Sequence, residues 1–175
     1  KDYALILTTN SGLWAYSIGD VVRFISKNPH RILVSGRTKH FTSAFGEHVI
    51  AFEVEEAMKA TVEKFPAQIT EFHLAPQVNP ENGALPYHEW FIEFEKEPEN
   101  LEDFRLNLDL EMRKRNTYYD DLIAGNILQV LKITKLQKNA FQEYAKSEGK
   151  LGGQNKIPRL ANDRKIGEFL KNFKI

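Results

Sequence analysis

Short apolar runs separated by turn-forming residues fill the first 37 positions of the chain. Such runs predict β-strands, and the Gly and Asn-Pro positions between them predict turns. The strands expected on this basis span residues 3–9, 13–18, 21–26 and 31–35. A meander this small buries too little apolar surface to be stable alone. We therefore expect it to pack against the rest of the chain or against a structure outside it.

The apolar spacing changes after residue 40. Between residues 54 and 65 apolar side chains recur at intervals of three and four, and Pro66 follows, which predicts an amphipathic helix that ends there. Residues 88–95 alternate, with Trp90, Ile92 and Phe94 on one face and mostly Glu on the other, which predicts a half-buried strand. Asn100 can cap a second helix. Further strands are expected at 40–44, 69–75 and 127–134, and further helices at 141–146 and 166–173.

The order of these elements predicts the fold class. From residue 40 onward the order is β-α-β-β-α-β, followed by two extra helices. This order is typical of a ferredoxin-like antiparallel sheet with helices on one face. We therefore predict an α+β fold, in which a short β-meander precedes a ferredoxin-like small domain with extra C-terminal helices.

The charges balance over the whole chain but are unevenly placed. The 175 residues include 24 Lys and Arg against 24 Asp and Glu. Residues 61–131 carry fourteen acidic and six basic groups, whereas residues 132–175 carry four acidic and eleven basic groups. This distribution predicts an acidic face and a basic face, either solvated or facing a charged ligand. Nucleic acid is not favoured as a partner, because aromatic residues are not interleaved with the basic ones.

The composition excludes several classes of protein. The chain has no Cys, which excludes disulfide scaffolds, thiolate zinc sites and Cys nucleophiles. It contains neither a signal peptide nor an apolar run of the roughly 18–20 residues that a membrane helix needs, so we expect a soluble, cytoplasmic protein with no membrane partner. The chain opens in a strand without an initiating Met, as expected for a piece of a longer protein.

Most sequence motifs of catalysis are missing. Five His are scattered without metal-ligand spacing, so we expect no metal site made by the chain itself. His73 and His88 fall in expected strands, where we interpret them as packing or surface residues. The sequence has no G-x-S-x-G nucleophile elbow, no Walker A motif and no G-x-G-x-x-G motif, so Ser hydrolase chemistry has no support.

Asp20 is a candidate ligand for a sugar. It follows Gly19 at the expected junction of two strands, from which a carboxylate can project into a cleft. Its two oxygens match the two vicinal hydroxyls of a ribose. The residues alone leave open the alternative of an ordinary Gly-Asp turn.

Two later motifs place a cation near glycine. Arg37 follows Gly36 where the meander ends, and a permanent cation there can bind a ribose or a phosphate. Lys156 lies between a Gly-Gly pair and Pro158, in a segment that we expect to be a mobile loop. An ammonium group on such a loop suits the negative charge that develops on a phosphoryl group. For Arg37 the alternative to a ligand-binding role is a turn with solvated charges, and for Lys156 it is a solvated basic loop.

Five stretches of the chain together resemble one family. In chain order they are YALILTTNSGLWAYSIGDVVRF, ILVSGRTK, GEHVIAFEVEEAM, NTYYDDL and GGQNKIPR. They resemble the C-terminal part of the auxin-responsive Gretchen Hagen family of acyl acid–amido synthetases, within the adenylate-forming superfamily. The resemblance covers nearly the whole chain. It implies that a carboxylic acid and ATP, with Mg²⁺, form an acyl-adenylate, and that the amine of an amino acid then displaces AMP.

The resemblance also implies roles for individual positions. Asp20 would bind the ribose hydroxyls, Tyr16 would lie beside the nucleotide, and Arg37 would support the ribose. Lys156 would be the catalytic lysine, reaching the α-phosphate and the acyl carboxylate. The remaining positions are two hinge residues and two supporting residues: Thr38, Lys39, Gln154 and Arg159.

A domain organisation follows from the same resemblance. Residues 1–37 would be the terminal strands of the large adenylating domain, residues 38–40 the hinge, and residues 41–175 the mobile small domain. The large N-terminal domain would be the partner of this chain and would hold most of the ATP, Mg²⁺ and acyl sites. We expect the chain alone to be inactive, because the reaction needs both walls of the cleft. Plant members usually carry Arg where this chain has Ala15 and Ser17, so their hormone substrates do not carry over.

Two alternatives stay open on the sequence. An acyl-CoA ligase, or another adenylate-forming enzyme, shares the first half-reaction. A non-catalytic ferredoxin-like module would instead bind a partner through its acidic or its basic face.

Overall fold

The computed structural model describes residues 1–37, 41–149 and 157–175. Its N-terminal part is an antiparallel sheet in the order β1-β2-β3, with β1 at Asp2–Leu7, β2 at Tyr16–Lys27 and β3 at His30–Arg37. The two strands expected on either side of Gly19-Asp20 are a single strand, β2, so the turn expected there was wrong. Gly19 has a φ of 84°, which bends β2 without interrupting it. The strand continues because β1 pairs with one of its edges and β3 with the other.

The segment that follows begins with a short strand, as predicted for residues 40–44, and in the described part of the chain this strand is two residues long. β4 (Phe41–Thr42) pairs with β5 (Val49–Ile50), and Gly46 lies between them with a φ of 90°. Helix α1 (Ala51–Lys64) starts immediately afterwards. It ends just before Pro66, as the apolar spacing predicted.

A three-stranded sheet forms the centre of the C-terminal part. Its strands are β6 (Gln68–Gln77), β7 (Tyr87–Lys96) and β8 (Lys132–Leu136), in that order, with a short 3₁₀ helix η1 (Glu81–Gly83) between the first two. β7 is antiparallel to β6 and parallel to β8, and the connection to β8 is made by α2 (Leu101–Arg115) and α3 (Thr117–Ala124). The α+β class is confirmed. The ferredoxin-like strand order is not, because β7 pairs directly with β8 and the short β4 pairs outside this sheet.

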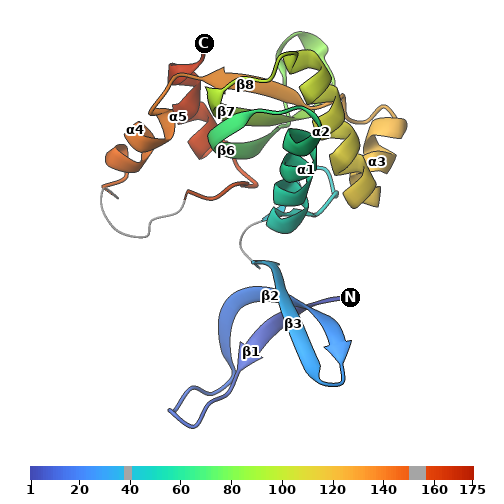
Figure 1. Ribbon diagram of the computed structural model, residues 1–175, viewed down its shortest axis with the longest axis vertical. Coiled ribbons are helices and arrows are strands. Elements are labelled where there is room, and N and C mark those ends of the chain that lie inside the picture. The colour runs from blue at the N-terminus through green and yellow to red at the C-terminus, as the bar shows by residue number, and fades with distance from the viewer. Residues whose placement is uncertain (38–40, 150–156) are drawn as a thin grey trace.

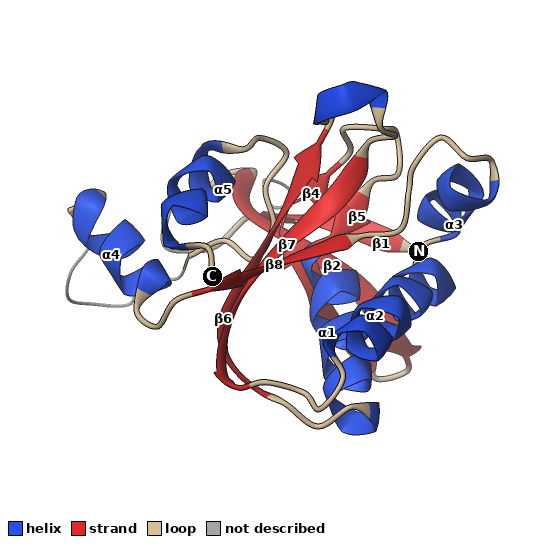
Figure 2. Cartoon of the chain, turned by 90° about the horizontal axis from the view of Figure 1, so that it is seen from above, coloured by secondary structure: helices blue, strands red, loops and turns tan. Residues whose placement is uncertain are grey.

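Helices cover both faces of this sheet. Trp90, Ile92 and Phe94 of β7 join the larger core with α1 and α2, as the alternation predicted. Phe91 points the other way, into a second core with α4 (Ala140–Ser147) and α5 (Lys165–Leu170). Figures 1 and 2 show α4 and α5 on one side of the sheet and α1 and α2 on the other. The expectation of helices on one face only was therefore wrong. A short 3₁₀ helix, η2 (Lys171–Phe173), follows α5.

The second core also buries two carboxylates of β7. Glu93 is 4% exposed and accepts a hydrogen bond of 2.9 Å from the backbone N–H of Asn139, at the start of α4. Glu89 accepts hydrogen bonds of 2.6 Å from Thr134 and from Arg164. Both charges thus have partners that offset the cost of their burial.

Candidate functional site

The meander brings two of the predicted nucleotide-binding positions together. Asp20 is half-buried in β2, and its backbone is directly opposite that of Arg37 in β3. Tyr16 is at the start of the same strand, opposite Leu7 of β1, and its side chain is 51% exposed. Neighbouring strands are about 4.8 Å apart. Positions 20 and 37, which are far apart in sequence, therefore meet at one place on the sheet.

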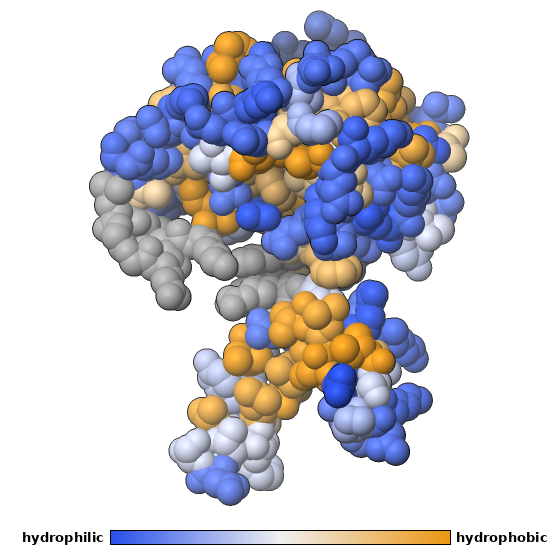
Figure 3. Space-filling model, viewed as in Figure 1, coloured by the Kyte–Doolittle hydropathy of each residue, from blue (hydrophilic) through white to orange (hydrophobic). Residues whose placement is uncertain are grey.

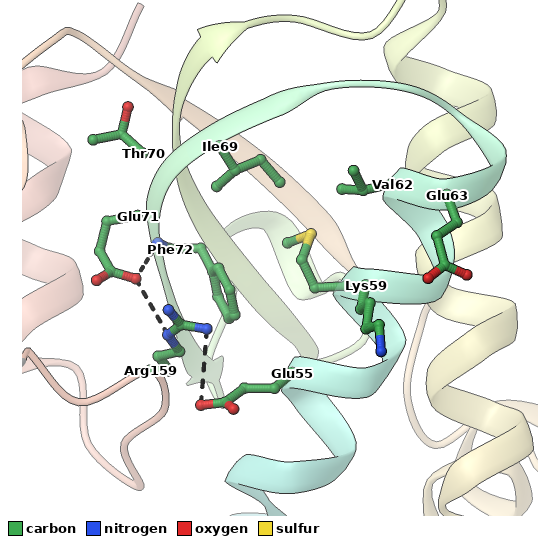
Figure 4. Close-up of a pocket in the computed structure, with 10 residues that line it drawn as sticks. Glu55, Lys59, Val62, Glu63, Ile69, Thr70, Glu71, Phe72 and Arg159 are labelled. Atoms are coloured by element: carbon green, nitrogen blue, oxygen red, sulfur yellow. Dashed lines mark hydrogen bonds and ion pairs between the residues drawn. The ribbon is translucent and has the colours of Figure 1, made fainter.

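Arg159 lies in a groove of about 340 Å³ between α1 and β6 (Figure 4). The floor of this groove is apolar, and its rim carries charges of both signs. Floor residues are Met58, Val62, Ile69 and Phe72, and charged residues are Glu55, Lys59, Glu63, Glu71 and Arg159. The groove is formed by segments that are distant in sequence, so no local motif indicated it.

Several predicted site residues fall outside the described part of the chain. These are Thr38, Lys39, Gln154 and Lys156, together with the side chain of Arg37. Their roles stay predictions, as does the convergence of Asp20 and Lys156 on one nucleotide.

A buried polar network was missed by the sequence analysis. His88, which is 1% exposed in β7, makes a 2.9 Å contact through Nε2 with Oε1 of the fully buried Glu47. Its ring stacks on Tyr119 at 5.0 Å between centroids, and the hydroxyl of Tyr119 donates a 2.6 Å hydrogen bond to Asp109. Burial raises the pKa of the Tyr119 hydroxyl, and the neighbouring Asp109 carboxylate raises it further. The interpretation of His88 as a surface residue is excluded, and its packing role is confirmed.

His73 is the second histidine whose position the structure settles. It is fully buried in β6, and its Nδ1 is 2.7 Å from the carbonyl oxygen of Pro158. Burial lowers the pKa of His73 to about 4, so the ring is neutral at pH 7. Because a carbonyl can only accept, Nδ1 carries the proton and donates.

Within residues 1–37, 41–149 and 157–175, no group of three or more His, Asp or Glu side chains could hold a metal ion. In the same part of the chain, no helix has both the length and the apolar character needed to cross a membrane.

Family models match both parts of the chain. The model of the GH3 family C-terminal domain matches residues 52–165, and that of the GH3 family central domain matches residues 1–37. The chain belongs to the GH3 family. The Gretchen Hagen resemblance carried by the five sequence stretches is therefore confirmed.

Individual GH3 proteins agree with this assignment. A curated relative, the probable indole-3-acetic acid-amido synthetase GH3.1 of Arabidopsis thaliana, is 26% identical over 183 residues, which is 97% of this chain and 31% of that protein. The chain therefore spans about a third of the length of this relative.

Solved structures share the fold. The GH3.15 acyl acid amido synthetase matches with a TM-score of 0.75 and 19% identity, over 99% of this chain and 34% of that one. AtGH3.15 acyl acid amido synthetase in complex with 2,4-DB matches with a TM-score of 0.76, also at 19% identity, over 99% of this chain and 33% of that one.

Proposed function

We propose that this GH3 chain is the C-terminal part of an ATP-dependent acyl acid–amido synthetase. The observation that carries the proposal is the match to two successive GH3 domain models on one chain, together with a curated relative named as an amido synthetase. In the first step, a carboxylate oxygen attacks the α-phosphorus of ATP, which gives an acyl-adenylate and releases pyrophosphate. In the second, an amino-acid nitrogen attacks the acyl carbon, which forms the amide and releases AMP.

Asp20 and Arg37 would form the ribose side of the nucleotide site. Their backbones are paired across β2 and β3, so positions 20 and 37 lie side by side on the sheet. The carboxylate of Asp20 would accept hydrogen bonds from the ribose hydroxyls, and Tyr16 would lie beside the nucleotide. Bonds of this charge-assisted kind contribute about 1.5–3 kcal/mol each.

Lys156 would stabilise the transition state of adenylation. Its ammonium would offset the negative charge on the α-phosphate and the acyl carboxylate. Removal of one such contact typically raises a barrier by about 2.7–4 kcal/mol. Mg²⁺ would be held by the phosphates of ATP and by the large N-terminal domain, since acidic residues of the described part of this chain form no metal cluster.

The exposed apolar surface of the meander supports a large partner domain. Trp14 is 85% exposed and Ile25 is 63% exposed, and Figure 3 shows a broad apolar area on this part of the molecule. Such a surface is typical of an interface. We assign residues 1–37 to the large domain, residues 38–40 to the hinge and residues 41–175 to a small domain that rotates between the two half-reactions. A cytoplasmic location stays a prediction.

The test is ATP–pyrophosphate exchange by the full-length protein with a panel of carboxylic acids. We expect exchange that depends on one class of acid, followed by AMP release when amino acids, but not CoA, are added. Lys156→Ala should slow the exchange about 100-fold or more. Lys150→Ala, six residues earlier in the same basic segment, is the matched control and should leave the rate unchanged. CoA-dependent AMP release would point to a CoA ligase, and no exchange with any acid would contradict the proposal.

A further inference from the structure

The groove between α1 and β6 has the size and the lining of a small-ligand site. Its volume of about 340 Å³ falls within the roughly 300–1,000 Å³ that ligand pockets occupy. Met58 and Val62 of α1 and Ile69 and Phe72 of β6 form an apolar floor. Such pockets usually combine an apolar lining with a small number of charged or polar groups. The groove can therefore hold a small molecule that is partly apolar and partly charged.

Arg159 offers a carboxylate-binding group beside this floor. Its guanidinium lies over the ring of Phe72, 4.7 Å from the centroid, and the side chain is 41% exposed. Its ion pairs with Glu71 and Glu55 measure 3.4 and 3.8 Å, longer than the roughly 2.7–2.9 Å of a charge-assisted hydrogen bond. The guanidinium is therefore held in place, but these two contacts do not saturate its five N–H donors. A planar fork of this kind binds a carboxylate through two parallel hydrogen bonds.

The carboxylate of Glu55 offers a site for an ammonium group next to Arg159. Glu55 and Glu71 approach the guanidinium from the two walls of the groove, α1 and β6 (Figure 4). Glu71 also accepts the N–H of Phe72 at 3.0 Å, whereas Glu55 is half exposed and makes only the long contact to Arg159 within the described residues. A guanidinium and a carboxylate side by side match the carboxylate and the ammonium that an α-amino acid carries on one carbon atom.

The other two charged residues of the groove do not favour an acidic ligand side chain. Lys59 is on α1, four residues after Glu55 and four residues before Glu63. Residues at this spacing are neighbours on a helix surface, so the two carboxylates offset the positive charge of Lys59. The part of the ligand that extends beyond the charged pair therefore meets mainly the apolar floor.

We propose that this groove binds an α-amino acid with an apolar side chain, as the acceptor of the second half-reaction, a proposal that rests on the function proposed above. The α-carboxylate binds Arg159, and the α-ammonium binds Glu55. The side chain lies on the floor, toward Val62 and Ile69, which Figure 4 shows beyond the charged pair.

Isothermal titration of the full-length protein with L-leucine tests the chemistry of the ligand. L-Leucine amide lacks the carboxylate and N-acetyl-L-leucine lacks the ammonium. Each should bind at least about 10-fold more weakly than L-leucine, because hydrogen bonds to charged groups contribute on that scale. L-Aspartate should also bind more weakly, because its side chain cannot use the apolar floor. No binding of L-leucine, or equal affinity for all four compounds, would overturn the proposal.

Variants locate the binding in the groove. Arg159→Met keeps the length of the stem without the charge and should weaken L-leucine binding about 10- to 100-fold, and Glu55→Gln should weaken it about 10-fold. Arg159→Lys keeps the charge without the fork and should lie between Arg159→Met and the wild type. The matched controls are Arg113→Met and Glu95→Gln, which break surface ion pairs elsewhere and should bind as the wild type does. Equal affinity of the Arg159→Met and Arg113→Met variants would overturn the proposal.

The KM for the amino acid in amide formation separates this proposal from the proposed function. We expect Arg159→Met and Glu55→Gln to raise this KM about 10-fold or more. If amide formation occurs and neither variant changes the KM, the groove is not the acceptor site, and the proposed function stands. If the groove binds L-leucine but no carboxylic acid supports ATP–pyrophosphate exchange, the proposed function fails and the acceptor role fails with it, whereas the amino-acid site remains.

Discussion

Glu47 and His88 form a hydrogen-bonded pair that is shielded from water and joins the start of the C-terminal part to its central strand. Oε1 of Glu47 and Nε2 of His88 are 2.9 Å apart, and neither side chain is more than 1% exposed. The other carboxylate oxygen of Glu47 accepts the N–H of Phe45 at 2.8 Å. Burial raises the pKa of Glu47, but the hydrogen bond and charge of His88 outweigh burial and hold the pKa below its ordinary value. The loop between β4 and β5 is thereby fixed to β7.

Loss of the Glu47 carboxylate should destabilise the protein strongly. Glu47→Ala removes one member of a buried pair and leaves the imidazole of His88 without its partner, so we expect a loss of about 3–5 kcal/mol in the free energy of unfolding. Glu47→Gln retains a hydrogen-bonding side chain of the same size and should cost less. Urea denaturation measures both values.

The control for this pair is an exposed ion pair of the same sheet. Glu95→Ala breaks a contact between Glu95 and Lys138, whose side chains are both more than half exposed, and should change the stability by less than about 1 kcal/mol. Equal losses in Glu47→Ala and Glu95→Ala would contradict the account.

Helices and caps that depend on residues close together in the chain could be predicted from the sequence. The helix ending before Pro66 and the cap at Asn100 both depend on residues within a few positions of each other, and both were confirmed. The second face of β7 was missed, because the helices that cover Phe91 come about 50 to 75 residues later in the chain. Gly19 was misinterpreted as a turn, because its bend is accommodated by strand pairing on both sides, which no local pattern reveals.

In the candidate site, too, short motifs could be recognised from the sequence, whereas contacts between distant residues could not. Asp20 and Tyr16 belong to one short sequence motif, and their roles beside a nucleotide stay predictions. The contacts of Arg159 were not predictable, since they depend on residues 55, 71 and 72, which precede it by more than 80 positions. The pairing of Glu47 with His88 spans 41 positions and leaves no spacing signal.

Asn100 should contribute measurably to stability as the N-cap of α2. Its side-chain oxygen accepts hydrogen bonds of 2.9 Å from the N–H of Glu102 and 3.2 Å from that of Asp103. Asn100→Ala leaves both donors without this acceptor and should cost about 1 kcal/mol, measured by thermal or urea unfolding. Asn100→Ser retains an oxygen acceptor at the cap and should cost less than Asn100→Ala. Equal stability of the Ala and Ser variants would contradict the capping role.

His73 should make the protein sensitive to acid. In the unfolded chain its imidazole binds a proton below about pH 6.5, whereas in the folded protein its pKa is about 4. The unfolded state therefore binds more protons between these values, so the free energy of unfolding falls as the pH falls from 6.5 to 4. At 1.36 kcal/mol per pH unit, the loss amounts to about 3 kcal/mol.

The measurement is urea denaturation of the wild type and of His73→Gln at several pH values from 7 to 4. Gln does not titrate, so the variant should lose less stability than the wild type over this range, by about 3 kcal/mol at most. Stability curves that run parallel from pH 7 to 4 would exclude His73 as the source.

Gly167→Ala should destabilise the protein although Gly167 is in a helix. In an exposed helix this change stabilises by about 1 kcal/mol. Here the added Cβ would be 2.7 Å from Cε2 of the buried Phe91 ring, which cannot move aside freely. Overpacking of this kind costs about 1–3 kcal/mol. The control is the double variant Gly167→Ala/Phe91→Leu. Its loss in the free energy of unfolding should be smaller than the sum of the losses in the two single variants, and a loss equal to that sum would contradict the clash.

Asp20→Asn should weaken nucleotide binding by the full-length protein. The proposed ribose contact depends on the negative charge of the carboxylate, and hydrogen bonds to charged groups contribute about 1.5–3 kcal/mol, so AMP affinity should fall about 10- to 100-fold. Isothermal titration with AMP measures the change. Asp2→Asn is the matched control in the same sheet, because the carboxylate of Asp2 pairs with Arg23 at 2.8 Å, and it should leave the affinity for AMP as it is. If Asp20→Asn binds AMP as tightly as Asp2→Asn does, the ribose contact is made elsewhere, and the placement of the nucleotide against β2 must be abandoned.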